Sequence, residues 1–266
     1  MTPVSVLALL AAGGYLFSLG PLPPTEAARA ARRWRTSALL GALAVIVLAL
    51  GWPVDQLAAR FQFGHMAQHL LLIAVAAPLL VLAEPWLAPL HLLPRRFRGP
   101  TGRVLFRDPR TRRVRSAAEF LAAPLVAWLL FHLTFVLFHI PALYDLTLRS
   151  RPVHDLEHLS FLGFAVLFWI PVIRRGSMGT QDRLLYLMAA GLVGSALGAW
   201  LAVAPVLYQG FIGASWLSPI ADQRLAAGLM GGPGSVDIAL ATGMILYRWL
   251  GEQERAVPRM VGGGST

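Results

Sequence analysis

The sequence predicts an all-α integral membrane protein, a bundle of about seven transmembrane helices with the N-terminus outside and the C-terminus in the cytoplasm. Three observations lead to this fold class. First, 56% of the 266 residues are hydrophobic and only 14% are charged, whereas soluble domains carry about 25% charged residues. Second, the apolar residues gather into long runs. Third, the arginines gather in alternate loops between these runs.

The apolar runs have the length and composition of membrane helices. A helix needs about 20 residues to cross the hydrocarbon core, so the second and fifth runs are short and their edges are approximate. An open sheet cannot cross lipid because its edge amides would stay unpaired, and the runs are too uniformly apolar for barrel strands. The predicted spans are residues 4–20, 37–52, 63–83, 120–140, 156–173, 184–208 and 225–249.

The arginines set the predicted orientation. All 23 basic residues are arginine, and 19 of them fall in the first, third and fifth loops and in the C-terminal tail. The opposite side carries only Arg60, Arg149, Arg151 and Arg224. Because cytoplasmic loops are enriched in basic residues, the arginine-rich side is predicted to be cytoplasmic. The net charge of +10 is then explained by topology and by contact with anionic membrane lipid, so nucleic acid is not predicted as a partner.

The chain divides into three predicted regions. Residues 1–52 hold two N-terminal transmembrane helices, residues 53–250 form a five-helix core that bears the histidines, and residues 251–266 form a cytoplasmic tail. Residues 84–119 are basic and rich in proline and glycine, which predicts a cytoplasmic surface segment. The N-terminal run has no basic residues before it, so it is not predicted to be a cleaved signal peptide. The absence of cysteine excludes disulfides, thiolate metal sites and a cysteine nucleophile.

Histidines form the most informative pattern in the chain. Six of the seven fall into three pairs: His65 with His69, His132 with His139, and His154 with His158. Residues four apart on a helix share a face, with Cβ atoms about 5–6 Å apart, and residues seven apart also share a face. The predicted topology puts all six in the outer half of the membrane. The seventh, His91, falls in the third loop and is assigned no role.

A metal ion is the simplest reason for so many imidazoles to converge. One membrane histidine alone is adequately explained by a hydrogen bond to a neighbouring helix. Six histidines in same-face pairs at one level are better explained by a site, because ionisable groups in lipid are costly and usually functional. Neutral imidazole suits copper, zinc, iron and nickel. We therefore predict a metal site at the six paired histidines.

Other polar or sulfur-bearing residues are candidate auxiliaries. Met66 lies between the first two histidines, and thioether sulfur favours Cu(I), although core or lipid-facing packing also accounts for it. Carboxylates beside ligating histidines often orient them, while a solvated charge is the alternative for each. The acidic candidates at the outer helix ends are Asp145, Asp155, Glu157 and Asp222. Met230 precedes the sequence GGPG, where Pro233 is predicted to kink or break the last helix.

Five segments together resemble the caa3-type cytochrome c oxidase assembly factor family, CtaG. They read HMAQHLLL, FHIPALYD, HDLEHLSFL, WLAVAPVLY and SPIADQRLAAGLM, and the resemblance runs from about residue 63 to 250. It implies a multi-pass protein of the bacterial plasma membrane that helps to assemble haem–copper oxidase, and it carries a ligand role onto every paired histidine in the matched segments. His132 lies outside them. After Met230 the chain reads GGPGSVDIAL, where bulkier apolar residues are expected, and Asp237 is an added acid.

The function predicted on this basis is a copper-handling assembly factor. It would bind copper, as Cu(I), at the outer-leaflet histidines and deliver it to cytochrome c oxidase subunits. No nucleophile–base arrangement is evident, so an enzyme is not predicted. Two alternatives remain open. A b-type cytochrome would need an axial imidazole on each side of its haem, which pairs four residues apart do not supply. A copper permease would need polar residues through the inner leaflet, where runs such as LIAVAAPLLVL are apolar. Zinc is the other candidate metal.

Overall fold

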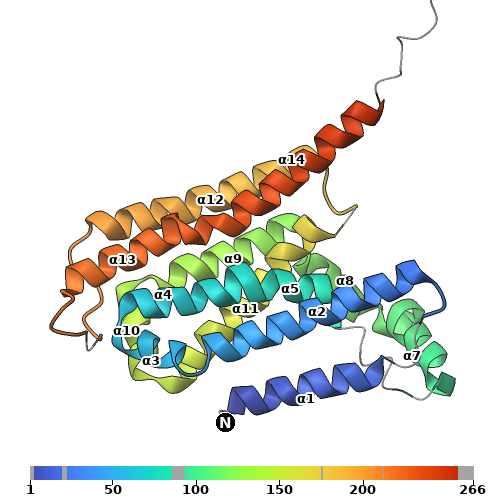
Figure 1. Cartoon of the computed structure of the whole chain (residues 1–266), viewed down its shortest axis with the longest axis horizontal. Helices are drawn as coiled ribbons and strands as arrows, with labels where there is room; N and C mark the ends of the chain where they lie inside the picture. Colours follow the sequence, from blue (N-terminus) through green and yellow to red (C-terminus); the bar gives the residue numbers. More distant parts are fainter. Residues whose placement is uncertain are drawn as a thin grey trace, which may run out of the picture.

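The computed structural model describes residues 3–19, 23–85, 93, 95–174, 176–211 and 213–256. His91 and the last ten residues of the tail, 257–266, lie outside the described residues. The described part of the chain is helical and contains no β-strand, apart from an isolated bridge between Ala214 and Leu217 (Figure 1). The predicted all-α class is confirmed.

The helices follow one another closely along the chain. In order they are α1 Pro3–Ser18, α2 Glu26–Ala49, α3 Val54–Arg60, α4 Gln62–Leu70, the π-helix η1 Leu71–Ala76, α5 Ala77–Ala83, α7 Arg95–Arg107, the 3₁₀ turn η3 Pro109–Thr111, α8 Arg112–Leu121, α9 Pro124–Phe138, α10 Pro141–Arg149, α11 Arg151–Ile173, α12 Thr180–Val203, α13 Pro219–Gly231, the 3₁₀ turn η4 Pro233–Ser235, and α14 Val236–Ala256. The predicted break at Pro233 is confirmed, because a 3₁₀ turn there separates α13 from α14.

The long helices run side by side along the long axis of the molecule (Figure 1). Helix α11 packs against α5, η1 and α9, while α2 packs against α5 and carries α1 on its outer side. Helix α12 packs against α13 and α14, and α13 also packs against α4. The main apolar core lies where α5, α9, α11 and α12 meet, and it includes Phe131, Phe161, Phe168, Trp169 and Leu187.

The outer surface carries many large apolar side chains. Phe17, Val203 and Tyr247 are each at least 80% exposed, and numerous exposed leucines accompany them. So many exposed large apolar side chains suit contact with lipid tails better than contact with water. The membrane character predicted from composition is therefore supported by the way in which the chain folds.

Four helical stretches are long and apolar enough to cross a membrane, namely Gln62–Ala83, Arg151–Ile173, Thr180–Val203 and Pro219–Glu254. Two bent pairs raise the number to six if each pair is one span: Glu26–Ala49 with Val54–Arg60, bent by 41°, and Pro109–Leu121 with Pro124–Phe138, bent by 65°. The first apolar run forms a shorter helix, Val6–Ser18. Among the described residues there are thus four to six candidate spans, and seven spans with the predicted orientation remain a prediction.

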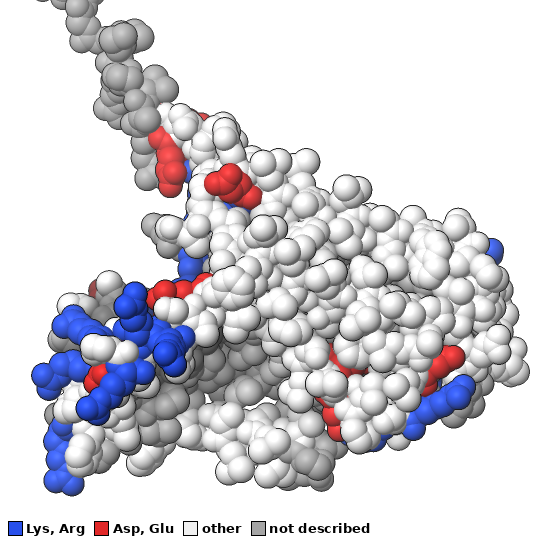
Figure 2. Space-filling model, turned by 180° about the vertical axis from the view of Figure 1, so that it is seen from behind, with Lys and Arg blue, Asp and Glu red and all other residues white. Residues whose placement is uncertain are grey.

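The two ends of the bundle differ in chemistry. Figure 2 shows basic side chains concentrated at one end of the face in view and few at the other. The described part of the arginine-rich segment 84–119 is not irregular but contains α7 and α8, at the end of the bundle opposite the first turns of α4 and α11 (Figure 1). At the arginine-rich end, Glu84 pairs with Arg35 at 2.8 Å and with Arg174 at 3.9 Å. The His65–His69 and His154–His158 pairs lie at the other end, in the first turns of α4 and α11.

Candidate metal centre

Two helices bring four of the predicted histidines together. His65 and His69 project from α4, and His154 and His158 project from the first two turns of α11. Within each pair the ring centroids are 4.3 and 4.2 Å apart. Between the helices, the His65 ring lies 5.4 Å from that of His154, and the His69 ring lies 5.2 Å from that of His158. The two same-face pairs therefore meet across one helix–helix contact.

Glu157 lies between the two pairs. Its side chain is completely buried, and its Oε2 atom is 3.5 Å from His65 Nε2 and 3.8 Å from His69 Nε2. It also lies within reach of His154 and His158 on its own helix. A carboxylate removed from water is costly unless it is paired with positive charge or a metal ion. Glu157 is thus part of the centre, and not the solvated end-of-helix charge that the sequence also allowed.

The centre holds an unusual number of buried polar atoms without hydrogen-bond partners. These atoms are His65 Nε2, both ring nitrogens of His69, His139 Nε2, His158 Nε2, Tyr144 Oη and both carboxylate oxygens of Glu157. Most buried polar atoms in proteins have a partner, and each exception requires an explanation such as a bound ion or water. Imidazole nitrogens and carboxylate oxygens are metal ligands at about 2.0–2.2 Å. The donor set therefore fits a metal ion.

His139 approaches the centre from α9. Its Nδ1 lies 2.7 Å from the Phe135 carbonyl oxygen, which can only accept, so Nδ1 carries the proton and Nε2 keeps its lone pair. A hydrogen bond of this kind commonly fixes the tautomer of a metal-ligating histidine. Burial, with a smaller contribution from the Asp145 carboxylate, raises the pKa of Tyr208 above its ordinary value. The Tyr208 hydroxyl therefore stays protonated, and it donates to the His139 carbonyl oxygen at 2.8 Å.

His132 is buried but lies apart from this centre. Its ring stacks on Trp128 at 4.0 Å, its Nδ1 lies 2.9 Å from the Trp128 carbonyl oxygen, and the ring also meets the backbone of Ala190. It lines a separate small cavity of about 60 Å³ that also includes Met230 and Asp237. The structure thus brings five of the six predicted histidines to one place and leaves His132 elsewhere.

The two candidate methionines pack with apolar neighbours. Met66 and Met230 are both buried in a cluster that includes Tyr144, Leu201 and Tyr208. Adjacent residues on a helix point about 100° apart, so Met66 turns away from the face that carries His65. The atoms that converge in the centre are therefore nitrogen and oxygen, without a described contribution from sulfur.

Asp222 holds the histidine helix in place. Its two carboxylate oxygens accept from the backbone amides of Gln62 and Phe63, at 2.8 and 2.9 Å. The first amides of a helix lack partners within it, and a carboxylate at that end also complements the helix dipole. Asp222 was predicted as an auxiliary ligand, but its geometry makes it the N-terminal cap of α4. That helix begins three residues before His65.

Gln223 is a functional residue of the frame that the sequence did not single out. Its side-chain amide donates to the carbonyl oxygens of Leu201, Ala204 and Pro205, and its Oε1 accepts from the Leu207 amide. One buried side chain therefore satisfies the last carbonyl groups of α12 and the segment that follows. The predicted span 184–208 accordingly ends earlier, because α12 stops at Val203.

Two further features fix α4 against its neighbours. A Cβ added to Gly64 would fall 2.6 Å from the carbonyl carbon and oxygen of Leu57, so glycine permits the close approach of α3. Directly after His69 and Leu70 the helix widens into the π-helix η1, a form often found at functional sites. There the Trp169 indole of α11 donates to the Ile73 carbonyl oxygen at 3.1 Å. The first contact packs α3 against α4, and the second ties the continuation of α4 to α11, which carries the other histidine pair.

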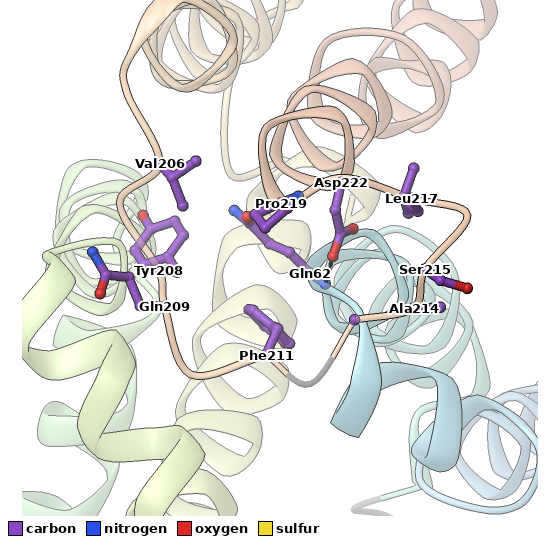
Figure 3. A pocket seen from close by; sticks show the side chains of 11 residues that line it. Gln62, Val206, Tyr208, Gln209, Phe211, Ala214, Ser215, Leu217, Pro219 and Asp222 are labelled. Atoms are coloured by element: carbon purple, nitrogen blue, oxygen red, sulfur yellow. Dashed lines mark hydrogen bonds between the residues drawn. The ribbon is translucent and has the colours of Figure 1, made fainter.

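Two cavities adjoin the centre. One, of about 580 Å³, opens directly onto His154 and His158 and is bordered by Asp55, Arg151 and Asp155. The other, of about 470 Å³, lies under the segment between α12 and α13, where Figure 3 shows Phe211 beside Gln62 and Asp222. The Phe211 ring lies 6.2 Å from that of His65 and 6.0 Å from that of Tyr144. Access to the imidazoles is therefore more direct from the first cavity.

Comparisons with known proteins agree with this description. Residues 13–252 match the model of a family described as cytochrome c oxidase caa3 assembly factor (Caa3_CtaG). Two uncharacterized proteins, one from Mycobacterium bovis and one from Mycobacterium tuberculosis, are each 28% identical to this chain over an alignment 287 residues long. The alignment covers 90% of this chain and 42% of each relative. The chain thus spans less than half the length of these curated relatives. No solved structure matches the chain.

Proposed function

Because the chain belongs to the cytochrome c oxidase caa3 assembly factor family, we propose that it supplies copper to the oxidase during assembly. In this proposal the protein lies in the plasma membrane of a bacterium and receives copper as cargo. It holds the copper at the centre formed by α4, α9 and α11, and it releases the copper to an oxidase subunit. The chain itself carries out no reaction on a substrate.

The observation that carries this proposal is the group of unpartnered buried donors. Five imidazoles and the Glu157 carboxylate converge in a place where water is largely excluded, and most of them have an atom without a hydrogen bond. Such a group costs free energy unless something cationic binds it. A structural network would pair these atoms with one another. A cargo site leaves them free for the ion.

Copper is the cargo that suits both the family and the donors. Imidazole binds copper well, and at a given nitrogen–oxygen site Cu²⁺ binds more tightly than the other divalent first-row metals. The expectation of Cu(I) depended on a thioether ligand, and Met66 packs in an apolar cluster. The nitrogen and carboxylate set supports Cu(II) at least as well, and Zn²⁺ remains the competing metal.

The surroundings suit a site that both loads and unloads. His154 is only partly buried and borders the 580 Å³ cavity, so an ion can reach α11 without unfolding of the bundle. Asp55 and Asp155 at that cavity supply negative charge that attracts a cation, although Asp155 also pairs with Arg151 at 3.2 Å. A partner that covered this cavity would be in position to take the ion.

The alternative functions receive less support. A haem needs a flat space between two axial imidazoles, whereas the four rings of α4 and α11 surround Glu157 with centroids 4.2 to 6.3 Å apart. A permease needs polar groups deeper in the bundle, and His132 and Asp237 line one cavity there. That cavity is about 60 Å³, too small for a continuous aqueous route.

The test is the copper content of the oxidase. The oxidase should be produced beside a variant that carries His65→Ala, His69→Ala, His154→Ala and His158→Ala, and then isolated and analysed for copper per haem. We expect the oxidase protein to be made but to lack most of its copper. The matched control is His132→Ala, which removes a buried histidine outside the centre and should leave the copper content unchanged.

The amount of each variant in the membrane should be measured by immunoblotting, so that loss of the factor is not mistaken for loss of the site. If the oxidase carries its full copper complement beside a normally abundant four-histidine variant, copper delivery is the wrong function. A role as an assembly scaffold would then explain the family relationship better.

A further inference from the structure

Glu157 divides the metal centre into two sets of donors. One set consists of His65 and His69 of α4 with Glu157, and the other consists of His154 and His158 with the same Glu157. In each set the three donor atoms lie within 4.8 Å of one another. Among the residues that the structure describes, each such set takes its histidines from one helix, either α4 or α11.

One ion does not fit both sets. Ligands bound at about 2.0–2.2 Å lie at most about 4.4 Å from one another across the ion. Each set is close to that limit, so a small side-chain adjustment would let it close around an ion. The two sets share only the carboxylate. A single ion would therefore use one pair of histidines and leave the other pair without a metal ion.

Glu157 has the chemistry of a bridge. Both of its oxygens are buried and neither has a hydrogen-bond partner. A carboxylate can bind one ion through each oxygen, and paired ions in proteins are typically about 3.5–4 Å apart. The histidine rings of the two sets are 5.2 to 6.3 Å apart, which places the two sets next to each other. The negative charge of the bridge would offset part of the repulsion between the ions.

We infer that the centre binds two metal ions bridged by Glu157, one ion held by His65 and His69 and the other by His154 and His158. The inference rests on the proposed function in that the ions are the copper cargo. It adds that the cargo is a pair of ions. The pair on α11 faces the 580 Å³ cavity, so this ion is the more accessible of the two.

The experiment measures copper stoichiometry on the full chain purified in detergent. The protein is loaded with Cu(II), freed of excess metal, and analysed for copper per chain. Wild type should hold two ions. The variants His65→Ala/His69→Ala and His154→Ala/His158→Ala should each keep one, the variant with all four substitutions should keep none, and the control His132→Ala should keep two.

A second measurement does not depend on any variant folding correctly. Two Cu(II) ions on one carboxylate bridge are magnetically coupled, so the spins counted by electron paramagnetic resonance should fall below the copper measured chemically. In Glu157→Gln, which removes the negative charge of the bridge, either one ion should be lost or the spin count should equal the copper content.

The results distinguish a failure of the two-ion inference from a failure of the proposed copper delivery. One copper per wild-type chain, abolished by either double substitution, would mean a single-ion site and would overturn the inference while leaving copper delivery intact. Two ions with a full spin count in wild type would overturn the bridge. Wild-type protein that binds no copper would reject the copper function and the inference together.

Discussion

His132 lies within α9 and His139 caps its C-terminal end two turns later, and the two residues share the same local chemistry but have different surroundings. Each ring is buried, and each holds Nδ1 within 3 Å of the carbonyl oxygen four residues earlier, Trp128 or Phe135. The His132 ring stacks on an indole and meets the Ala190 backbone. His139 Nε2 has no hydrogen-bond partner and faces the centre that holds Glu157.

The difference shows that the groups across from a histidine, and not its own helix, make it a candidate metal ligand. Both rings direct Nδ1 at the carbonyl oxygen four residues earlier, which can only accept a hydrogen bond. Only His139 meets other buried donors that lack hydrogen-bond partners. His132 has partners for its ring and is a core residue. Three measurements test whether His132 and His139 differ in this way.

The largest expected difference concerns copper affinity. His139→Ala should weaken copper binding by about 10–100-fold, because it removes a nitrogen beside the ions, whereas His132→Ala should change it little. Competition against a chelator of known affinity, with the purified protein in detergent, measures both. Equal weakening by the two substitutions would show that α9 acts through packing and that His139 is not a ligand.

A smaller and opposite difference is expected in the stability of the metal-free protein. His132→Ala should lower the free energy of unfolding by about 1–3 kcal/mol, because it removes a ring packed on Trp128 and a buried hydrogen bond. His139→Ala loses a similar hydrogen bond but also removes an unpartnered nitrogen, so its cost should be lower. Thermal unfolding in detergent with excess chelator compares them. A larger loss for His139→Ala would contradict the assignment of His132 to the core.

The smallest effect is expected at Asp237. It lines the same cavity as His132, and Asp237→Asn keeps its shape but removes the ionisable group. Because substitutions at separate sites act independently within a few tenths of a kcal/mol, copper affinity should change less than about twofold. The chelator competition used for the histidines applies here too. A clear loss of copper binding would connect this cavity to the centre and revive the permease alternative.

The histidine centre was largely predictable because helix periodicity alone brings together residues four apart. His65 lies beside His69, and His154 lies beside His158, as expected. The two pairs also meet each other, although their helices are far apart in sequence. His132 was grouped with them because seven residues return a side chain to nearly the same face. Two residues on the same face of a helix can still lie at different depths in the bundle. Seven residues advance the helix by roughly 10 Å, which takes His132 into a different layer of side chains from His139.

The role of Glu157 was underestimated for a reason that lies in the helix boundary. The apolar run begins near residue 156, so Glu157 looked like a charge at the water-exposed edge. In the structure α11 begins at Arg151, which carries Glu157 into the second turn and buries it. Asp222 was ambiguous for a related reason, since an acid near a helix end can cap, ligate or simply be solvated. Only the approach of α4 to α13 shows that it caps.

The span count was harder to predict because hydropathy records composition and not bending. The helix of the run near residues 37–52 is followed by a second helix at an angle of 41°, and most of the run near 120–140 is preceded by a second helix at an angle of 65°. Proline and glycine mark these breaks in the sequence, but they do not give the angle. The order and character of the helices were predictable, while the number that cross the membrane depends on geometry between elements.

The π-helical turns after His69 make the centre sensitive to chain length. A π-bulge is in effect one residue more than an α-helix would contain, and one residue corresponds to a rotation of about 100°. The π-helical segment itself is anchored to α11 by the hydrogen bond from the Trp169 indole to the Ile73 carbonyl oxygen. Removing a single residue from Leu71–Ala76 would restore regular winding and swing His65 and His69 about a quarter turn away from Glu157. In this stretch a one-residue deletion, even of an alanine, is a more drastic change than most substitutions.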